Sequence, residues 1–224
     1  TTSFRILHLP PLPELPPFLS GRSVVVIDGA VLASDDAADR MLAELRALRP
    51  EMDTFLRVPA AALTRLHMDP EGSAAAVGGS TMLAGLPDAG IDAFLAASAD
   101  RSRTSLMVAE LRQLGGALAR PAVDGGAVSH LDGQFLAFGT GMVFGPEMAR
   151  RVGADVSAFT AALAPWTGGR TYLNFTENSV DPRRGYDDVT WRQLAGIRSA
   201  VDPLGTFAAN HPVPRLFEDG HPTR

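Results

Sequence analysis

The stretch of sequence that decides the fold is residues 171–213, TYLNFTENSVDPRRGYDDVTWRQLAGIRSAVDPLGTFAANHPV. It opens with a short apolar and aromatic run, Thr171–Phe175, which predicts a strand. A helix is predicted over Tyr186–Val201, because a proline at position 203 disfavours helical backbone at the residue before it. A strand, a polar loop and a helix are therefore expected at this end of the chain.

The rest of the chain alternates short apolar runs with helical patterns. Strands are predicted at residues 23–28, 53–58, 106–111 and 134–143, helices at 34–48, 59–66, 88–99 and 146–163, an extended connector at 10–17 and a loop at 68–79. No glycine-rich turn joins a strand to a helix as it does in a dinucleotide-binding fold. The pattern favours an α+β fold with a mostly antiparallel sheet that helices cover on one side.

Three glycines, Gly139, Gly141 and Gly145, are spaced much like those of a nucleotide-binding loop. They lie at the end of a strand pattern with one residue too many, and the turn after them does not open a helix directly. We interpret them as strand-end glycines that permit close packing.

Composition excludes several classes of function. The net charge of −5 disfavours a sequence-independent nucleic-acid binder, and the absence of cysteine excludes a thiolate nucleophile, a cysteinyl metal site and a cysteinyl flavin link. All twenty basic residues are arginine, so a lysine Schiff base is excluded as well. No apolar run is long enough to span a membrane, and no signal-peptide pattern is present at the start. A cytoplasmic protein with no membrane partner is expected.

Short motifs in residues 172–213 resemble the C-terminal segment of berberine-bridge-enzyme-like, PCMH-type FAD-linked oxidases. That family's pattern runs Y-x-N-Y/F, R-L, I-K, Y-D-P, F and N-x-x-I. The matching residues here, in the same order, are Tyr172-Leu173-Asn174-Phe175, Gln193-Leu194, Ile197-Arg198, Val201-Asp202-Pro203, Phe207 and Asn210 to Val213. The departures are Gln193 for arginine, Arg198 for lysine and Val201 for tyrosine.

A second stretch, ELRQLGGALAR at 110–120 with His130 about ten residues later, is similar to bacterial members of the family. In those proteins the strand faces the substrate pocket. The likeness extends loosely to 53–70, and so to nearly the whole chain.

The resemblance implies a domain organisation. Residues 1–165 would be a substrate-binding domain, incomplete at its N-terminus, and 166–224 a berberine-bridge-like segment that returns towards the flavin domain. FAD would be held mainly by an N-terminal domain outside this chain, as a linked domain or a separate chain. The expected partners are that flavin domain, a small-molecule substrate and, through an exposed apolar face, a second copy of the chain.

The resemblance also implies roles for four residues. Tyr172 would be catalytic, and Asn174, Phe175 and Asn210 would contact the cofactor. Phe175 departs from the tyrosine that many alcohol-oxidising relatives carry there as a base. Since phenylalanine has no proton to exchange, the role passes to Tyr172, to His130, to the missing domain, or to nothing if the substrate is an amine.

Three residues are candidates for binding the substrate: Arg112, Gln113 and His130. Arg112 and Gln113 are adjacent in a predicted strand, so only one of them faces the pocket. The alternatives are an Arg112 paired with Glu110, a surface His130, and a Tyr172 and Phe175 that serve only the core. No histidine lies at metal-ligand spacing from another, so no metal site is expected.

Two functions follow. The first is the substrate-binding part of an FAD-dependent oxidoreductase that oxidises a small alcohol or amine by hydride transfer to flavin, with this chain alone inactive. The second is a non-catalytic α+β binding or scaffold module derived from such an oxidase.

Overall fold

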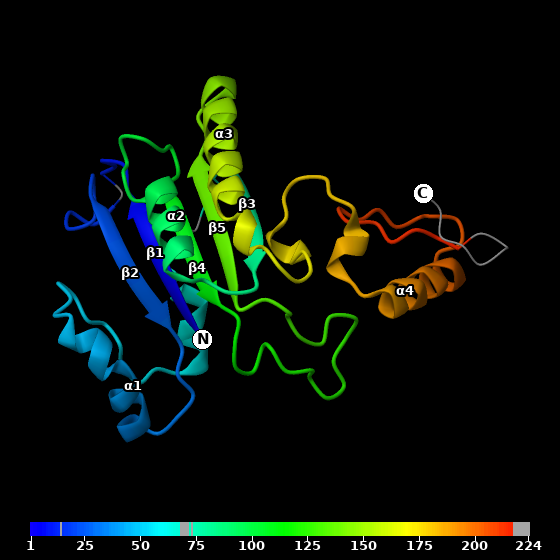
Figure 1. The fold of residues 1–224 in the computed structure, drawn as a ribbon, viewed down its shortest axis with the longest axis horizontal. Coiled ribbons are helices and arrows are strands. Elements are labelled where there is room, and N and C mark those ends of the chain that lie inside the picture. Colours follow the sequence, from blue (N-terminus) through cyan, green and yellow to red (C-terminus); the bar gives the residue numbers. More distant parts are fainter. Residues whose placement is uncertain (14, 68–71, 73, 217–224) are drawn as a thin grey trace.

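The computed structural model describes residues 1–13, 15–67, 72 and 74–216. Its centre is a five-stranded sheet in the order β2-β1-β4-β5-β3, and every neighbouring pair of strands is antiparallel (Figure 1). The strands are β1 Thr2–His8, β2 Ser23–Gly29, β3 Ala76–Leu83, β4 Val108–Gln113 and β5 Phe135–Met142. The predicted α+β fold with an antiparallel sheet is confirmed.

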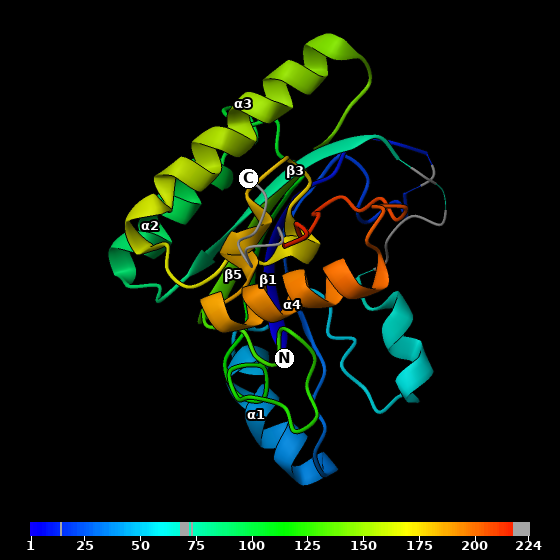
Figure 2. The same ribbon diagram turned by 90° about the vertical axis from the view of Figure 1, so that its right-hand side faces the viewer.

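Two helices cover one face of the sheet. They are α2, Asp88–Ser98, and α3, Pro146–Ala162, and Figure 2 shows both on the same side. The main core lies beneath them, where Phe94 of α2 meets Phe159 of α3 edge to face at 5.6 Å. The other two α-helices lie away from this layer, α1, Asp35–Ala47, near the end of β2 and α4, Asp188–Val201, beyond β3 (Figure 1).

The close approach of α3 to the sheet depends on glycine. A Cβ atom on Gly79 of β3 would lie 2.6 Å from Cγ1 of Val156, and one on Gly139 of β5 would lie 2.9 Å from the Phe159 ring. Neither distance leaves room for a side chain. The interpretation as close-packing strand residues is confirmed for Gly139 and Gly141 and is wrong for Gly145, which follows β5, has open space where a Cβ would lie and is the N-cap of α3.

Replacing Gly79 with alanine is expected to destabilise the fold by about 1–3 kcal/mol, the usual effect of overpacking a core. Urea unfolding would measure it. Because Val156 is the group that a new methyl would strike, the variant Gly79→Ala with Val156→Ala should recover part of the loss. If the two substitutions simply add, close packing by Val156 is not the reason for glycine at this position.

Several predicted elements differ from those observed. The strand predicted at 53–58 is wrong: these residues pair with no strand of the sheet, and the Asp53 carboxylate instead accepts a hydrogen bond from the Phe55 amide at 3.0 Å and pairs with Arg46 at 2.8 Å. The helix predicted at 59–66 is a 3-10 helix, Ala60–Arg65. The loop predicted at 68–79 is wrong from residue 76, where β3 begins, while 68–71 and 73 lie outside the described residues.

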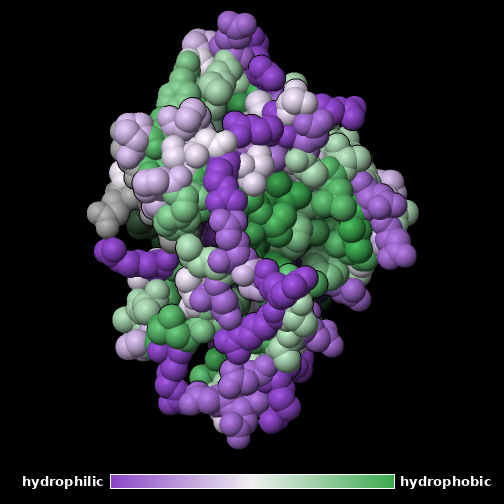
Figure 3. Space-filling view, turned by 90° about the vertical axis from the view of Figure 1, so that its left-hand side faces the viewer, coloured by the Kyte–Doolittle hydropathy of each residue, from purple (hydrophilic) through white to green (hydrophobic). Residues whose placement is uncertain are grey.

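Strand β2 forms one edge of the sheet and exposes apolar side chains. Val25 is 61% exposed, and a hydrophobic area is visible on this side of the molecule (Figure 3). The one charged residue of β2, Asp28, is buried, so the exposed side of this edge strand is a surface on which a second copy could pair, and a homodimer stays a prediction. Within the described residues, no helix has both the length and the apolar character to cross a membrane.

Candidate functional site

The sheet face opposite α2 and α3, which we call the site face, carries Arg5, Met82, Glu110, Leu136 and Phe138. Met82 and Leu136 form a second, smaller core there with Leu114. Segment 171–177 packs on this core, and the Ser80 hydroxyl donates a hydrogen bond of 2.8 Å to the Phe175 carbonyl. The 171–213 stretch is thereby fixed to the sheet on the face that the helices leave open.

A cavity of about 420 Å³ lies where segment 170–186 meets the loop 115–133. Its volume is in the range of small-molecule sites. The polar and aromatic residues that line it are Arg120, Ser129, His130, Asp132, Arg170, Tyr172, Asn174 and Tyr186. Apolar wall comes from Met82, Leu118, Val128, Leu131 and Leu173.

Backbone hydrogen bonds within the loop 115–133 stabilise its conformation. The Leu131 amide donates to the Leu118 carbonyl at 2.8 Å and the Ala122 amide to the Ser129 carbonyl at 3.0 Å, so the loop folds back as an irregular hairpin. Gly133 closes it against the sheet, since a Cβ atom there would lie 2.9 Å from Cε of Met82. These contacts place His130 at the cavity.

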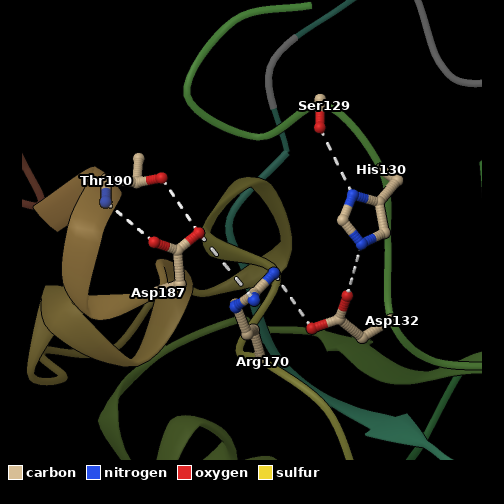
Figure 4. Close-up of polar contacts among 6 residues, drawn as sticks. All are labelled: Ser129, His130, Asp132, Arg170, Asp187 and Thr190. Carbon is tan, nitrogen blue, oxygen red and sulfur yellow. Dashed lines mark hydrogen bonds and ion pairs between the residues drawn. The ribbon is translucent and has the colours of Figure 1, made fainter. Parts of the chain in front are cut away.

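An ionic network joins the two walls (Figure 4). Asp132 lies 3.0 Å from Nε2 of His130 and 3.0 Å from the Arg170 guanidinium, which is itself 4.0 Å from Asp187. The Ser129 hydroxyl is 3.3 Å from Nδ1 of His130. Asp132 therefore links the loop to segment 170–186 and orients the imidazole ring.

Asp187 also begins α4. Its carboxylate accepts hydrogen bonds from the amide and the hydroxyl of Thr190, at 2.8 and 2.9 Å. These bonds, with the nearby charge of Arg170, hold the pKa of Asp187 below its ordinary value. One ionised carboxylate thus caps the helix and supports the arginine of the cavity wall.

The strand predicted over Thr171–Phe175 is wrong, because Leu173–Phe175 is a 3-10 turn. The Thr176 hydroxyl donates to the Tyr172 carbonyl at 3.1 Å and helps to close this turn. In a strand, residues 172 and 175 would point to opposite faces, whereas residues three apart in a 3-10 turn lie one above the other. The rings of Tyr172 and Phe175 accordingly stack, with centroids 5.5 Å apart.

The Phe175 ring contacts three other side chains of the site face, those of Tyr172, Phe138 and Arg112. Its ring meets Phe138 edge to face at 5.5 Å, and the guanidinium of Arg112 lies 4.9 Å from its centroid. Arg112 also pairs with Glu110 at 2.8 Å. Arg112 is thus paired with Glu110, and its contact with a substrate stays a prediction.

Replacing Phe175 with alanine is expected to cost about 2 kcal/mol of stability, because one half-buried ring with two ring contacts and a cation contact is lost. It should also free the Tyr172 ring. Urea unfolding gives the first effect, and quenching of tyrosine fluorescence by acrylamide gives the second. Phe175→Leu, which keeps most of the apolar volume, is the control. If Phe175→Ala were as stable as wild type, the ring contacts of Phe175 would not stabilise the site face.

The structure brings most of the predicted residues together. Tyr172, Asn174 and His130 line the cavity, and the Asn174 amide donates a long hydrogen bond of 3.5 Å to the Tyr172 hydroxyl. Phe175 stacks on Tyr172 and Arg112 lies over the Phe175 ring, but neither Phe175 nor Arg112 lines the cavity.

Two predicted residues lie elsewhere. Gln113 faces the helix side, where its Oε1 accepts a hydrogen bond from Thr2 at 3.1 Å beside a separate hollow of about 300 Å³. The alternation of β4 that directs Arg112 to the site face sends Gln113 away from it. Asn210 is exposed outside the cavity, next to His211, which lies 3.1 Å from the Thr176 carbonyl.

The sequence interpretation missed a buried ionic cluster on the site face. Arg5 pairs with Asp28, His67 lies 3.4 Å from the same carboxylate, and Ser3 donates to Glu110 at 2.6 Å. Arg5, Asp28 and Glu110 are only 6%, 8% and 4% exposed. The available signal was a serine and an arginine alternating with apolar residues in TSFRILH, which is the pattern of a two-faced strand. Among the described residues, no group of three acidic or histidine side chains could hold a metal ion.

The chain was compared with protein families, curated proteins and solved structures. No protein-family model matches the chain, and no curated protein matches it. Solved structures match its fold. A berberine bridge enzyme variant aligns over 97% of this chain and 49% of its own, with a TM-score of 0.72 and 12% identity.

Two further structures agree. A berberine-bridge-enzyme-like protein of Physcomitrella patens covers 95% of this chain and 47% of its own, with a TM-score of 0.67 and 16% identity. A chitooligosaccharide oxidase covers 97% and 48%, with a TM-score of 0.64 and 14% identity. The chain has the fold of one part of these berberine-bridge-enzyme-like oxidases, and it spans about half the length of the solved structures that it matches.

Proposed function

We propose that this chain is the substrate-binding part of an FAD-dependent oxidoreductase that oxidises a small alcohol or amine by hydride transfer to flavin. The observation that carries the proposal is the cavity on the site face, whose walls bring Tyr172 and Asn174 of the family motif next to His130. A scaffold that binds no ligand would have no need of such a cavity, and flavin reduction separates the oxidoreductase from a non-catalytic binding module.

The described residues fit one side of a flavin ring better than a whole FAD molecule. Tyr172, Phe175 and the exposed Asn174 offer an aromatic surface and an amide edge. The helix N-termini suit a diphosphate poorly, because each of the four α-helices in the described part of the chain carries an acidic residue in its first turn: Asp35 and Asp36, Asp88, Glu147, and Asp188. In this proposal a separate flavin-binding domain or chain holds the rest of the cofactor.

The bound flavin would supply the hydride acceptor. This chain would bind and orient the substrate and would accept the proton that the substrate loses. Phe175 cannot take a proton. The Tyr172 hydroxyl, in contrast, lies at the cavity and accepts a hydrogen bond from the Asn174 side-chain amide. His130, held through Nε2 by Asp132, is a second group that can exchange a proton there. An alcohol needs such a group to accept its hydroxyl proton, and a neutral amine does not.

The test pairs this chain with the flavin-binding domain or chain encoded with it. Small primary alcohols and amines are added without oxygen, and loss of the oxidised-flavin absorbance is followed. At least one substrate should reduce the flavin in the pair and leave the flavin domain alone oxidised. A pair that binds flavin but is reduced equally fast without this chain contradicts the proposal.

A further inference from the structure

We infer that the cavity binds a small, mainly apolar molecule that carries a carboxylate, and that Arg120 is the residue that holds this carboxylate. The inference rests on the proposed function in one respect, namely that the molecule bound there is the substrate. The binding itself is a property of this chain and can be measured without flavin.

The charged groups of the cavity are unequally engaged. Two arginines and one aspartate line it, and Asp132 is already shared by Arg170 and His130. Among the residues that the structure describes, none forms a hydrogen bond or an ion pair with the Arg120 guanidinium. Arg170 lies 3.0 Å from Asp132 and 4.0 Å from Asp187, so its charge is already balanced, and Arg120 is left as the arginine of the lining without a counter-charge among the described residues. Arg120 is therefore the group of the lining that is available to pair with an anion.

Arg120 is an exposed residue of the cavity lining whose main chain is fixed by the loop. Its amide donates to the Ala117 carbonyl at 3.2 Å and closes a turn in the loop 115–133, between Leu118 and the hydrogen-bonded Ala122. Its guanidinium can hold the two oxygens of one carboxylate in parallel, a geometry that ammonium and amide groups do not offer.

The apolar residues of the cavity determine which kind of carboxylate would fit. Apolar side chains from both walls, Leu118, Val128, Leu131 and Leu173, surround a space of about 420 Å³. Arg120 comes from the loop, whereas Tyr172 comes from the other wall. A molecule anchored at Arg120 would therefore extend across apolar surface towards the Tyr172 hydroxyl. Aryl and branched aliphatic carboxylates have this combination of charge and shape.

The experiment is a calorimetric titration of the purified chain with benzoate, phenylacetate and cinnamate, each beside its neutral primary amide. The carboxylates should bind at least about tenfold more tightly than their amides, because a paired charge is lost in the amide. Arg120→Gln should remove this preference. The matched control is Arg151→Gln, which changes an exposed arginine of α3 on the opposite side of the sheet and should keep it.

Equal binding of acids and amides, no binding of any acid, or an unchanged preference in Arg120→Gln would each overturn the inference. Its failure is distinct from failure of the proposed function. Flavin reduction by carboxylate-bearing substrates at a rate independent of Arg120 would refute the carboxylate site alone. Arg120-dependent binding in a chain that promotes no flavin reduction would refute the oxidoreductase role alone.

Discussion

Tyr172→Phe is expected to slow flavin reduction by an alcohol about a hundredfold, the usual effect of losing a group that accepts the substrate proton. The ring should stay in place, because its stacking on Phe175 does not involve the hydroxyl. Anaerobic stopped-flow absorbance on the chain paired with its flavin domain would measure the rate. The flavin spectrum should not change.

The other tyrosine of the chain supplies the control. Tyr186 also lines the cavity, but its ring packs against Trp191, with centroids 5.8 Å apart. Tyr186→Phe should therefore leave the rate within about twofold of wild type. If both variants slow the reaction equally, or neither does, Tyr172 is not the catalytic residue. Reduction by an amine should depend little on either hydroxyl, since no hydroxyl proton is removed.

Asp28→Ala is expected to destabilise the fold by about 3–5 kcal/mol, because it leaves the buried Arg5 guanidinium without its counter-charge. The Arg5 and Asp28 side chains are 7% and 10% exposed. The buried Nε of Arg5 has no hydrogen-bond partner among the described residues, and Glu110, which lies opposite Arg5 on β4, is already paired with Arg112 and Ser3. Urea unfolding would measure the loss.

Replacing both partners separates the charge effect from the packing effect. Arg5→Met with Asp28→Leu should recover most of the stability, because an apolar pair of similar volume leaves no buried charge. Glu51→Ala, which breaks the exposed pair with Arg22, should have no measurable effect on unfolding. A cost below about 1 kcal/mol for Asp28→Ala would mean that water reaches this pair.

Much of the fold could be predicted from periodicity. Helices α2 and α3 and strand β5 follow regular apolar patterns and lie where they were expected. Strand β1 was missed because its site face is charged, with Arg5 in the middle, so it lacks a continuous apolar run. Strand β3 was missed because Gly78, Gly79 and Ser80 suggest a loop, whereas the close approach of α3 requires small residues there.

The site was predictable in its members but not in its arrangement. The motif identified Tyr172 and Asn174, yet their relation to Phe175 depends on a 3-10 turn that replaced the expected strand. The link from Asp132 to Arg170 joins segments far apart in sequence, so only the folded chain reveals it. Gln113 was separated from Arg112 by simple alternation, a choice that one sequence leaves open until the helix-covered face is known.

The most direct test of the account is the visible absorption spectrum of this chain after incubation with FAD and removal of free cofactor. The account predicts a colourless chain of unmodified mass, and an oxidised-flavin spectrum only when the flavin-binding domain or chain is present. A flavin spectrum retained by the chain alone would mean that these residues hold the cofactor themselves. That result would contradict the division of the site between a substrate-binding part and a separate flavin-binding part.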